Sequence, residues 1–560
     1  MKKLVIVESE CKAKRFKEFL DADYEVVTCY GTVRDLPEKE IGVNVTETDV
    51  EVQFVTPEKS ERTLEFLRNK VDKSSMVYLA CDPDYEGEFM AFHLHKNLAQ
   101  SRKDCQRFKR ILCNELMAEK VKLAIEEPVE MDLGFIAAHL SRRVFDRLTG
   151  FKMASVLTKQ FGKGVPANLR QAVALRMVMD REKKVKQFKP TEYWEVSAIF
   201  NDHEYKLFTG VGKKNPTWLQ KTTAEDLMSI LEVKNELAVT SMEFIDHCDK
   251  PPLPFCTATL LQAANKVLGL SVEETMKAAQ KLYEWGYITY MRTKGTYVCE
   301  EAAKMARDHI RKKYGEEFVG KDRSDETYTK QSECIRPTKL VSGMNLVEPE
   351  RSLLQLICKR FIASQMAACQ VKYQVVKANN PALEYAARKN SYYEGLFFKC
   401  LTNCVTNPGY RQLLKPEDVE FEMVEFSRDE FLDVNIGDKM ELSGFDCSNG
   451  QSNEPERFSE GTLVRDLEAA GVLAPRTIVP LMKALKNRGL IEMDGMFLRP
   501  TERGSQIGDY LAEWFDEITR KEYVAQMERQ LELIANGEKW KPFVISFNET
   551  LEKLVEKVEK

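Results

Sequence analysis

The stretch Tyr78–Leu94, YLACDPDYEGEFMAFHL, places four carboxylates within seven residues: Asp82, Asp84, Glu86 and Glu88. The apolar residues before them are typical of a buried strand, and the residues after them are typical of the first turns of a helix. Carboxylates gathered at such a place repel one another and lose part of their hydration, which is costly. The stretch therefore indicates that something positive binds at this end of a sheet.

The spacing of the acids favours a magnesium site. In an extended segment Asp82 and Asp84 point to the same side, and Glu86 can join them as the helix begins. Oxygen ligands with no His or Cys nearby are the ligands that Mg²⁺ prefers. A solvated acidic helix N-terminus is the alternative, and the helix dipole would favour Glu86 and Glu88 there. It does not account for Asp82, which directly follows the apolar YLAC.

The first 150 residues alternate strand and helix patterns. The runs LVIVES and YLACD both end in acids, and amphipathic helical patterns follow them. This alternation predicts a parallel α/β sheet, whose ligands gather beyond the carboxyl ends of its strands. Glu8 and Asp82 should therefore face one site.

The remaining chain changes its pattern several times. The predicted segments are basic helices over 140–188, strands over 191–248, a proline-rich DKPPLPF at 249–255, helices over 257–374, short strands over 375–455 and helices over 458–545. A helical block between two β-rich segments is typical of an inserted domain joined by two crossings, which would form a hinge. Within the last segment, two predicted helices followed by MFLRP have a winged-helix-like order.

Composition excludes several classes of protein. The chain has 560 residues, enough for several domains, and no apolar run long enough for a transmembrane helix. The net charge of −5 argues against a uniformly basic surface but leaves room for a local basic groove. The 14 cysteines contain no CxxC pair, which predicts buried thiols, no zinc site and a reducing, intracellular compartment.

A second stretch, YEWGYITYMRTKGTYV at 283–298, contains four tyrosines. Packing in a core is the plain interpretation of such an aromatic group. Tyr290 differs because Arg292 projects to the same side of an extended segment, where a guanidinium could hold a phosphate beside the phenol oxygen. That pair suits a tyrosine nucleophile in phosphoryl transfer.

Taken together, the motifs resemble those of type IA DNA topoisomerases over nearly the whole chain. In order they are LVIVES with KAK at 4–14, VRDLP at 33–37, DPDYEGE at 82–88, RRVFDRLTGF at 142–151, QAVALRMVMDRE at 171–182, PPLPF at 251–255, TMKAAQKLYEWGYITYMRT at 275–293, IRPT at 335–338 and RFIASQM at 360–366.

The resemblance implies a multidomain toroidal fold that combines α/β and mainly-α parts. The implied division is a TOPRIM metal-binding α/β domain at 1–150, a helical single-strand DNA groove at 151–190 and 456–560, a β-rich arch at 191–248 and 375–455, and a helical domain carrying the nucleophile at 249–374.

The resemblance also implies the chemistry. Tyr290 would attack a phosphate of single-stranded DNA, form a 5′-phosphotyrosyl bond and release a 3′-hydroxyl, while Arg292 stabilises the charge on the phosphate. Lys12 would give a proton to the leaving 3′-oxygen beside Glu8. Mg²⁺ would be held by Asp82, Asp84 and Glu86, with Glu8 as a further residue of the metal site. The implied DNA-binding residues are Arg142, Arg170, Gln171, Arg176, Gln280, Glu284, Thr289, Arg336 and Thr477.

Resealing from such an ester needs no ATP, and the sequence has no GxxxxGK[ST] loop, since the nearest match, GEEFVGKD, ends in Asp322. The expected substrate is single-stranded or negatively supercoiled DNA, with no membrane, a monomeric enzyme and room for a helicase partner. A cytoplasmic, nucleoid-associated protein of a prokaryote, or otherwise an intracellular protein, is expected. Because the cysteine-rich C-terminal fingers of many relatives are missing, distributive relaxation or decatenation is expected.

Five positions depart from the family pattern. Thr32 stands where histidine is usual, NLRQ at 168–171 replaces GRVQ, Lys294 replaces an acid, Ser332 replaces a histidine, and LAPRT at 473–477 loses an arginine at Ala474. The alternative function is therefore a catalytically impaired paralogue that binds single-stranded DNA. A primase or nuclease with a TOPRIM-like domain would not explain ITYMRT.

Overall fold

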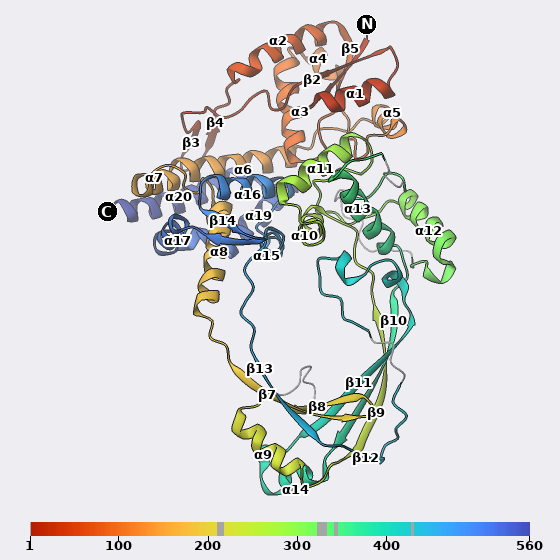
Figure 1. Ribbon diagram of the computed structural model, residues 1–560. Helices are drawn as coiled ribbons and strands as arrows, with labels where there is room; N and C mark the ends of the chain where they lie inside the picture. Colours follow the sequence, from red (N-terminus) through yellow and green to blue (C-terminus); the bar gives the residue numbers. More distant parts are fainter. Residues whose placement is uncertain (1, 210–217, 322–332, 341–344, 427–430) are drawn as a thin grey trace.

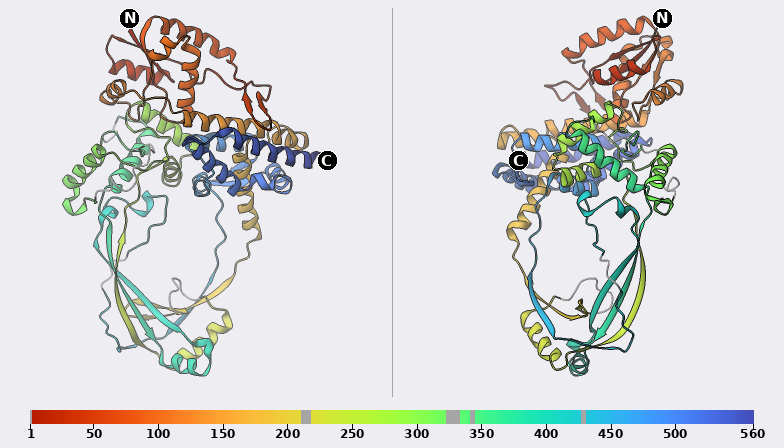
Figure 2. Two further views of the ribbon diagram at one scale, coloured as in Figure 1. Left: turned by 180° about the vertical axis from the view of Figure 1, so that it is seen from behind. Right: turned by 45° about the vertical axis from the view of Figure 1, so that its right-hand side comes forward.

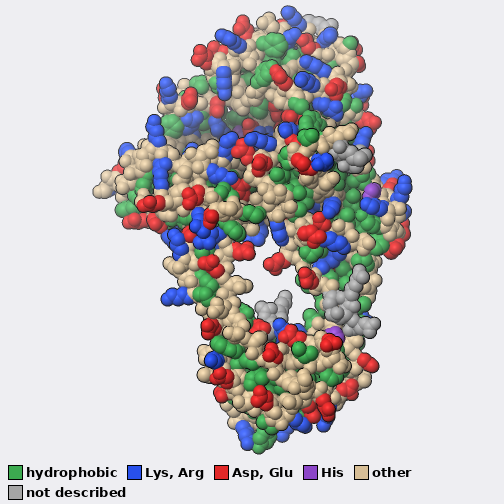
Figure 3. Space-filling model, viewed as in Figure 1, with side chains coloured by type: hydrophobic (Ala, Val, Ile, Leu, Met, Phe, Trp, Pro, Cys, Tyr) green, Lys and Arg blue, Asp and Glu red, His purple; other side chains and the backbone are tan. Residues whose placement is uncertain are grey.

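The computed structural model describes residues 2–209, 218–321, 333–340, 345–426 and 431–560. The chain forms a ring: an N-terminal α/β part stands on a layer of helices, and a long β-sheet closes the ring on the opposite side (Figure 1). The same arrangement is visible from behind and from the side (Figure 2). The space-filling view shows an opening through the molecule between the helices and the sheet (Figure 3).

The N-terminal part is built on a parallel sheet in the order β2-β1-β5-β6. Leu4 and Ile6 face one core while Val5 and Val7 face another, so both sides of β1 are buried, as the apolar run LVIV predicts. The elements are β1 (Lys2–Val7), α1 (Glu10–Phe19), β2 (Tyr24–Thr28), the hairpin β3 (Val43–Val45) and β4 (Val50–Val52), α2 (Glu58–Asp72), β5 (Ser74–Leu79), α3 (Tyr85–Leu98), α4 (Arg102–Arg107), β6 (Phe108–Arg110) and α5 (Ala118–Glu126).

A layer of helices lies beneath this part, and we call it the helical layer. Its first helix, α6, packs on α3 above it and on α19 and α20 beside it. The ring of Phe145 on α6 makes edge contacts with Phe543 and Phe547 on α20. The elements are α6 (Leu133–Phe151), α7 (Met153–Phe161), α8 (Leu169–Gln187), α15 (Glu460–Ala469), η5 (Pro475–Thr477), α16 (Ile478–Asn487), β14 (Ile491–Asp494), β15 (Phe497–Pro500), α17 (Glu502–Trp514), α18 (Asp516–Thr519), α19 (Lys521–Ala535) and α20 (Trp540–Glu559).

The order of α15, α16 and the hairpin β14-β15 is the helix, helix and hairpin order that the sequence predicts for this segment. No described helix is both long and apolar enough to cross a membrane. All 14 cysteines are free thiols.

The sheet that closes the ring, here called the arch, has seven strands in the order β12-β9-β10-β11-β8-β7-β13. Its core is separate from the core shared by the rest of the ring. The elements are β7 (Glu192–Phe200), β8 (His203–Thr209), α9 (Lys221–Leu231), β9 (Glu236–Asp249), β10 (Cys369–Asn379), α14 (Pro381–Lys389), η2 (Ser391–Tyr393), β11 (Leu396–Asn407), β12 (Lys439–Glu441) and β13 (Phe445–Gln451).

Between β9 and β10 the chain makes a block of helices, which we call the helical block. It contains α10 (Thr257–Leu268), α11 (Val272–Glu284), α12 (Glu300–Tyr314), η1 (Glu316–Phe318) and α13 (Glu350–Ser364). The expectation of helix up to residue 374 is wrong: α13 ends at Ser364 and β10 begins at Cys369. The segment CQVKYQVVKAN alternates and is rich in valine, which favours a strand paired on both sides.

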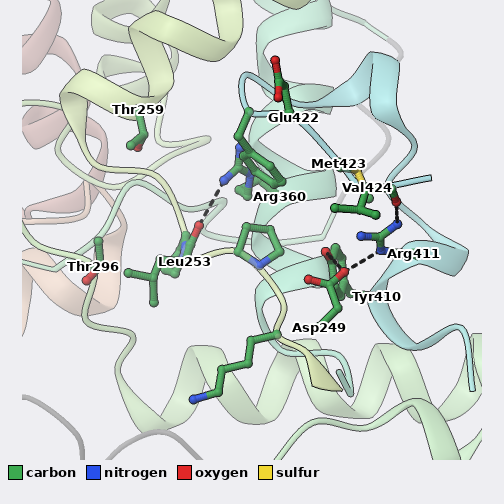
Figure 4. A pocket seen from close by; sticks show the side chains of 14 residues that line it. Asp249, Leu253, Thr259, Thr296, Arg360, Tyr410, Arg411, Glu422, Met423 and Val424 are labelled. Atoms are coloured by element: carbon green, nitrogen blue, oxygen red, sulfur yellow. Dashed lines mark hydrogen bonds and ion pairs between the residues drawn. The ribbon is translucent and has the colours of Figure 1, made fainter. Parts of the chain in front are cut away.

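The helical block meets the arch at the ends of β9 and β10, where the short η3 (Gly409–Gln412) and η4 (Pro416–Asp418) follow β11. Asp249, the last residue of β9, accepts a hydrogen bond from the Tyr410 hydroxyl at 2.7 Å and pairs with Arg411 (Figure 4). Arg360 of α13 pairs with Glu420 and donates to the Leu253 carbonyl. Asp249, Arg360 and Arg411 are among the residues that line a cavity of about 390 Å³ at this junction.

Candidate active site

Asp82 and Asp84 lie where β5 gives way to α3. Asp84 is the N-cap of α3, and its carboxylate accepts hydrogen bonds from the backbone N–H groups of Glu86 and Gly87. A Cβ at Gly87 would stand 2.1 Å from the Asp82 carbonyl oxygen, so this tight turn requires glycine. The turn brings the three carboxylates of Asp82, Asp84 and Glu86, here called the acidic cluster, to the sheet edge that the sequence predicts.

Behind the acidic cluster lies a buried ion pair. Lys12 Nζ is 3.1 Å from Asp82 Oδ1, and both side chains are buried. Glu8 accepts a hydrogen bond from the backbone N–H of Asp82. Burial and the charge of Asp82 raise the pKa of Glu8 to about 8. Burial opposes ionisation of Asp82, but the Lys12 ammonium, the hydrogen bond with Glu8 and the charges of the nearby arginines together outweigh it and hold the pKa of Asp82 below its usual range.

Tyr290 reaches the acidic cluster from the helical block. It follows α11 in a loop whose backbone is fixed to the N-terminal part, because the Tyr290 N–H donates to the Asn114 carbonyl at 2.9 Å. Its hydroxyl donates to Asp84 and lies 3.4 Å from Asp82 Oδ2. Burial and the nearby Asp84 charge raise the pKa of Tyr290 well above its usual value. The phenol oxygen therefore lies at the boundary between two parts of the molecule, next to the acids.

Two arginines face the same place. Arg292 Nη1 is 3.8 Å from Asp82 Oδ2, which puts this predicted residue on the side of Tyr290 where the acids lie. Arg476 is closer and was not among the predicted residues. Its Nη1 is 2.6 Å from Glu86 Oε2, its Nε pairs with Asp84, and its Nη2 donates to the Tyr290 oxygen at 3.3 Å.

The family pattern has an arginine at position 474, where this chain has alanine. The chain carries an arginine two positions later, and that neighbouring residue is the signal that could have pointed to the site. Arg476 lies in η5, just before α16, so it enters from the helical layer.

The predicted residues Thr289 and Arg336 lie in the protein interior. Arg336 is 2% exposed and pairs with Glu115 and Glu333 at 2.7 Å each. Its backbone N–H donates to the Thr289 hydroxyl, which in turn donates to the Cys334 carbonyl. The two residues thus attach the Tyr290 loop to its surroundings.

The predicted arginines of the groove are paired with acids of the helical layer. Arg142 and Arg170 both pair with Glu528, at 2.5 and 2.8 Å, and Arg170 also pairs with Asp146. Arg176 pairs with Asp516 at 2.8 Å. The structure therefore brings Arg142 and Arg170 together through one carboxylate and places Arg176 elsewhere.

The predicted polar residues divide between two places. Glu284 accepts hydrogen bonds from Gln280 at 3.0 Å and from Ser9, next to Glu8, at 3.3 Å. Gln171 accepts from Arg488 at 2.7 Å within the helical layer. Thr477 donates to the Ala474 carbonyl at 2.8 Å, in the same short helix as Arg476.

The departures from the family pattern are placed as follows. Lys294 pairs with Glu532 of α19 at 2.7 Å, Thr32 is half-buried in the turn after β2, and Ala474 is buried. Asn168 caps α8 by accepting from the Gln171 N–H. Ser332 lies outside the described residues.

The donor chemistry of the acidic cluster fits Mg²⁺, because it consists of carboxylate oxygens from three residues. In this structure those oxygens surround the Arg476 guanidinium. Within the described part of the chain, no group of three or more His, Cys, Asp or Glu side chains is arranged to hold a metal ion. Carboxylates of a kind that could hold the ion are thus present, but they are turned toward an arginine.

Comparisons with known proteins agree with one another. Residues 130–545 match the family model described as DNA topoisomerase, and residues 3–116 match the Toprim domain. The chain is 33% identical over 557 residues to DNA topoisomerase 1 of Aquifex aeolicus (strain VF5), covering 98% of each. It resembles the structure of full-length topoisomerase I from Thermotoga maritima with a TM-score of 0.84 and 29% sequence identity, over 100% of this chain and 90% of that one.

Proposed function

Because the chain belongs to the family of type IA DNA topoisomerases, an isomerase family that acts on DNA, we propose that it breaks and rejoins one DNA strand through Tyr290 without ATP. One observation carries the proposal: the Tyr290 hydroxyl donates to Asp84 and lies within reach of two arginines. A nucleophile, a proton acceptor and positive charge for a phosphate are thus adjacent.

In the proposed cleavage step, the Tyr290 oxygen attacks the phosphorus of a backbone phosphate. A bond forms between that oxygen and phosphorus, and the bond from phosphorus to the 3′-oxygen breaks. The tyrosine proton passes to Asp84, its hydrogen-bond partner. Lys12, whose ammonium lies against Asp82, supplies a proton to the leaving 3′-oxygen. Rejoining reverses these steps, and the ester conserves the energy of the broken bond.

Arg292 serves to bind the phosphate under attack. A guanidinium offers several N–H donors to phosphate oxygens, and its charge offsets the charge that develops during transfer. Its Nη1 lies 3.8 Å from Asp82 Oδ2, a longer ion pair than the 2.6 Å between Arg476 Nη1 and Glu86 Oε2.

Toprim domains typically bind Mg²⁺. We propose that Asp82, Asp84 and Glu86 would hold it here, with Glu8 positioning the backbone of Asp82. When bound, the ion would supply positive charge to the phosphate oxygens during rejoining.

For the DNA groove we propose the helical layer and the adjoining face of α11. Arg142, Arg170 and Arg176 would exchange their present carboxylate partners for phosphates, a process that should depend strongly on salt. Gln280 and Glu284 lie beside Ser9, near the scissile position.

We also propose the division into Toprim domain, groove, arch and nucleophile-bearing block, with the two junctions of the block as the hinge that opens the ring.

The proposal is tested with negatively supercoiled plasmid and Mg²⁺ in the absence of ATP, followed by separation of topoisomers on agarose. The wild-type protein should relax the plasmid, and Tyr290→Phe should not. Tyr287→Phe is the matched control, since Tyr287 is in the same loop and should leave relaxation unchanged. If the wild-type protein binds single-stranded DNA but never relaxes or cleaves it, the impaired paralogue is the correct function.

A further inference from the structure

Arg476 occupies the centre of the acidic cluster. Its three guanidinium nitrogens each meet a different carboxylate: Nε pairs with Asp84, Nη1 lies 2.6 Å from Glu86, and Nη2 lies 3.4 Å from Asp82. The acids that the family uses for a cation thus already share one, supplied by the chain itself.

We propose that Arg476 is a built-in counter-ion of the acidic cluster, which competes with the divalent cation for these carboxylates and moves to the DNA phosphate when the cation binds. This inference rests on the proposed function, because it concerns the same site, and it adds a means of regulating metal loading.

The charges around the cluster support competition. Asp82, Asp84 and Glu86 can carry three negative charges, and Lys12, Arg292 and Arg476 lie against them with three positive ones. A divalent ion added to this balanced set would face the guanidinium at close range, where like charges repel. Arg476 must therefore move away for the ion to bind.

Arg476 is able to move. Its side chain is 24% exposed, whereas Lys12 is 3% exposed, so this arginine, unlike the lysine, has a path to solvent. It belongs to η5 in the helical layer and crosses to the N-terminal part only through its side chain. A change of side-chain conformation would release the carboxylates without moving the backbone that supports them.

The place to which Arg476 can move follows from its fourth contact. Nη2 donates to the Tyr290 oxygen at 3.3 Å. A phosphate attacked by that oxygen must lie next to it, so the released guanidinium is already beside the phosphate. In this way Arg476 takes over the task of the arginine that the family pattern places at position 474, where this chain has alanine.

The test measures Mn²⁺ binding to the DNA-free protein by electron paramagnetic resonance, because Mn²⁺ accepts the same carboxylate ligands and is directly visible. Arg476→Ala should bind Mn²⁺ about tenfold more tightly than the wild-type protein, equivalent to about 1.4 kcal/mol. Arg476→Gln, which keeps much of the side-chain volume, should also bind more tightly, and Arg476→Lys should bind nearly as weakly as the wild-type protein. Arg465→Ala, an exposed arginine of α15 outside the site, is the matched control and should leave binding unchanged.

The inference is overturned if Arg476→Ala and Arg476→Gln both bind Mn²⁺ as weakly as the wild-type protein, or more weakly. That result would show that Arg476 only organises the carboxylates. If Arg476→Ala does not fold, the glutamine variant decides alone. The titration uses no DNA and measures binding of the ion, not cleavage of a strand. Its outcome is therefore independent of plasmid relaxation, which tests the proposed function.

Discussion

The Tyr290 hydroxyl and the Asp82 carboxylate lie 3.4 Å apart although 208 positions separate them in the sequence. Each belongs to a segment with a recognisable pattern, so both residues could be named from the sequence. Arg476 is missed, because the family motif has its arginine at position 474 and none at position 476, although the neighbouring arginine itself is visible in the sequence. The contacts of a long, flexible side chain depend on packing among three separate parts of the chain.

At the residue scale, His93 should make the N-terminal part less stable in acid. It is 1% exposed among Phe54, Phe89 and Phe92, and neither ring nitrogen has a partner among the described residues. Burial, with the charge of Arg34, lowers the pKa of His93 from 6.5 to about 4. The folded state thus binds this proton less readily than the unfolded state.

The sign of the pH effect follows from that difference. Above about pH 6.5 the histidine is neutral in both states, and its effect on stability is absent. As the pH falls toward about 4, only the unfolded state gains the proton, so the free energy of unfolding should fall by up to about 3 kcal/mol. His93→Phe should remove this component, as measured by denaturant unfolding at several pH values. If the free energy of unfolding falls equally with pH in the wild-type protein and in His93→Phe, the pH effect does not come from His93.

At the scale of elements, the sequence predicts the existence and type of several strands and helices, since β1, β5, α3 and α5 all overlap patterned runs. It does not predict the order of strands in the arch. Glu192 of β7 pairs with Gln451 of β13, and no local pattern links residues that far apart. The sequence does not predict that β10 begins as early as Cys369, because no clear change in apolar pattern separates the end of α13 from the start of this strand.

Asn380 should be a principal support of the arch. It is fully buried, caps α14 by accepting from Ala382 and Leu383, and donates to the carbonyls of Lys234 and Glu236. Asn380→Ala would leave these buried groups unpaired, so the free energy of opening of β9 and β10 should fall by about 2–4 kcal/mol. Native-state hydrogen exchange measures this quantity strand by strand.

The matched control is Asn390→Ala. Asn390 is exposed and its side chain accepts one hydrogen bond, from the Tyr392 N–H at 3.0 Å, so its loss should cost roughly 0.5 kcal/mol. Equal effects of the two substitutions would mean that burial of the cap contributes little to the arch.

At the scale of the whole molecule, the ring has one closure that is not covalent. The helical block continues into the arch at both of its ends, whereas it meets the N-terminal part through side chains and backbone contacts such as Lys120–Glu301 and Tyr283–Cys113. The family and the toroidal fold expected from the sequence are both confirmed by the comparisons. No single sequence motif predicts how this closure opens, because the opening depends on contacts between segments that are distant in the sequence.

If the ring opens at this interface, a bridge across it should stop strand passage. Lys120 of α5 and Glu301 of α12 form an exposed pair at 2.7 Å, so cysteines at both positions can be joined by a short thiol cross-linker after the exposed Cys105 and Cys248 are replaced by serine. The cross-linked protein should no longer relax plasmid, whereas each single-cysteine variant treated alike should relax it normally. Formation of the covalent DNA adduct in the same samples separates a gating defect from a chemical one. Continued relaxation by the bridged protein would place the opening elsewhere.

The most direct measurement of the central claim follows the DNA itself. A single-stranded oligonucleotide labelled at its 3′ end is mixed with the protein, the reaction is stopped with SDS, and the bound peptide is identified after proteolysis. The label should remain on the protein, attached to the peptide that contains Tyr290, and Tyr290→Phe should leave it free, while a 5′ label should be released on a shortened strand. A label that stays on the DNA in all cases, or an adduct on another residue, would contradict the assignment of Tyr290 as the nucleophile.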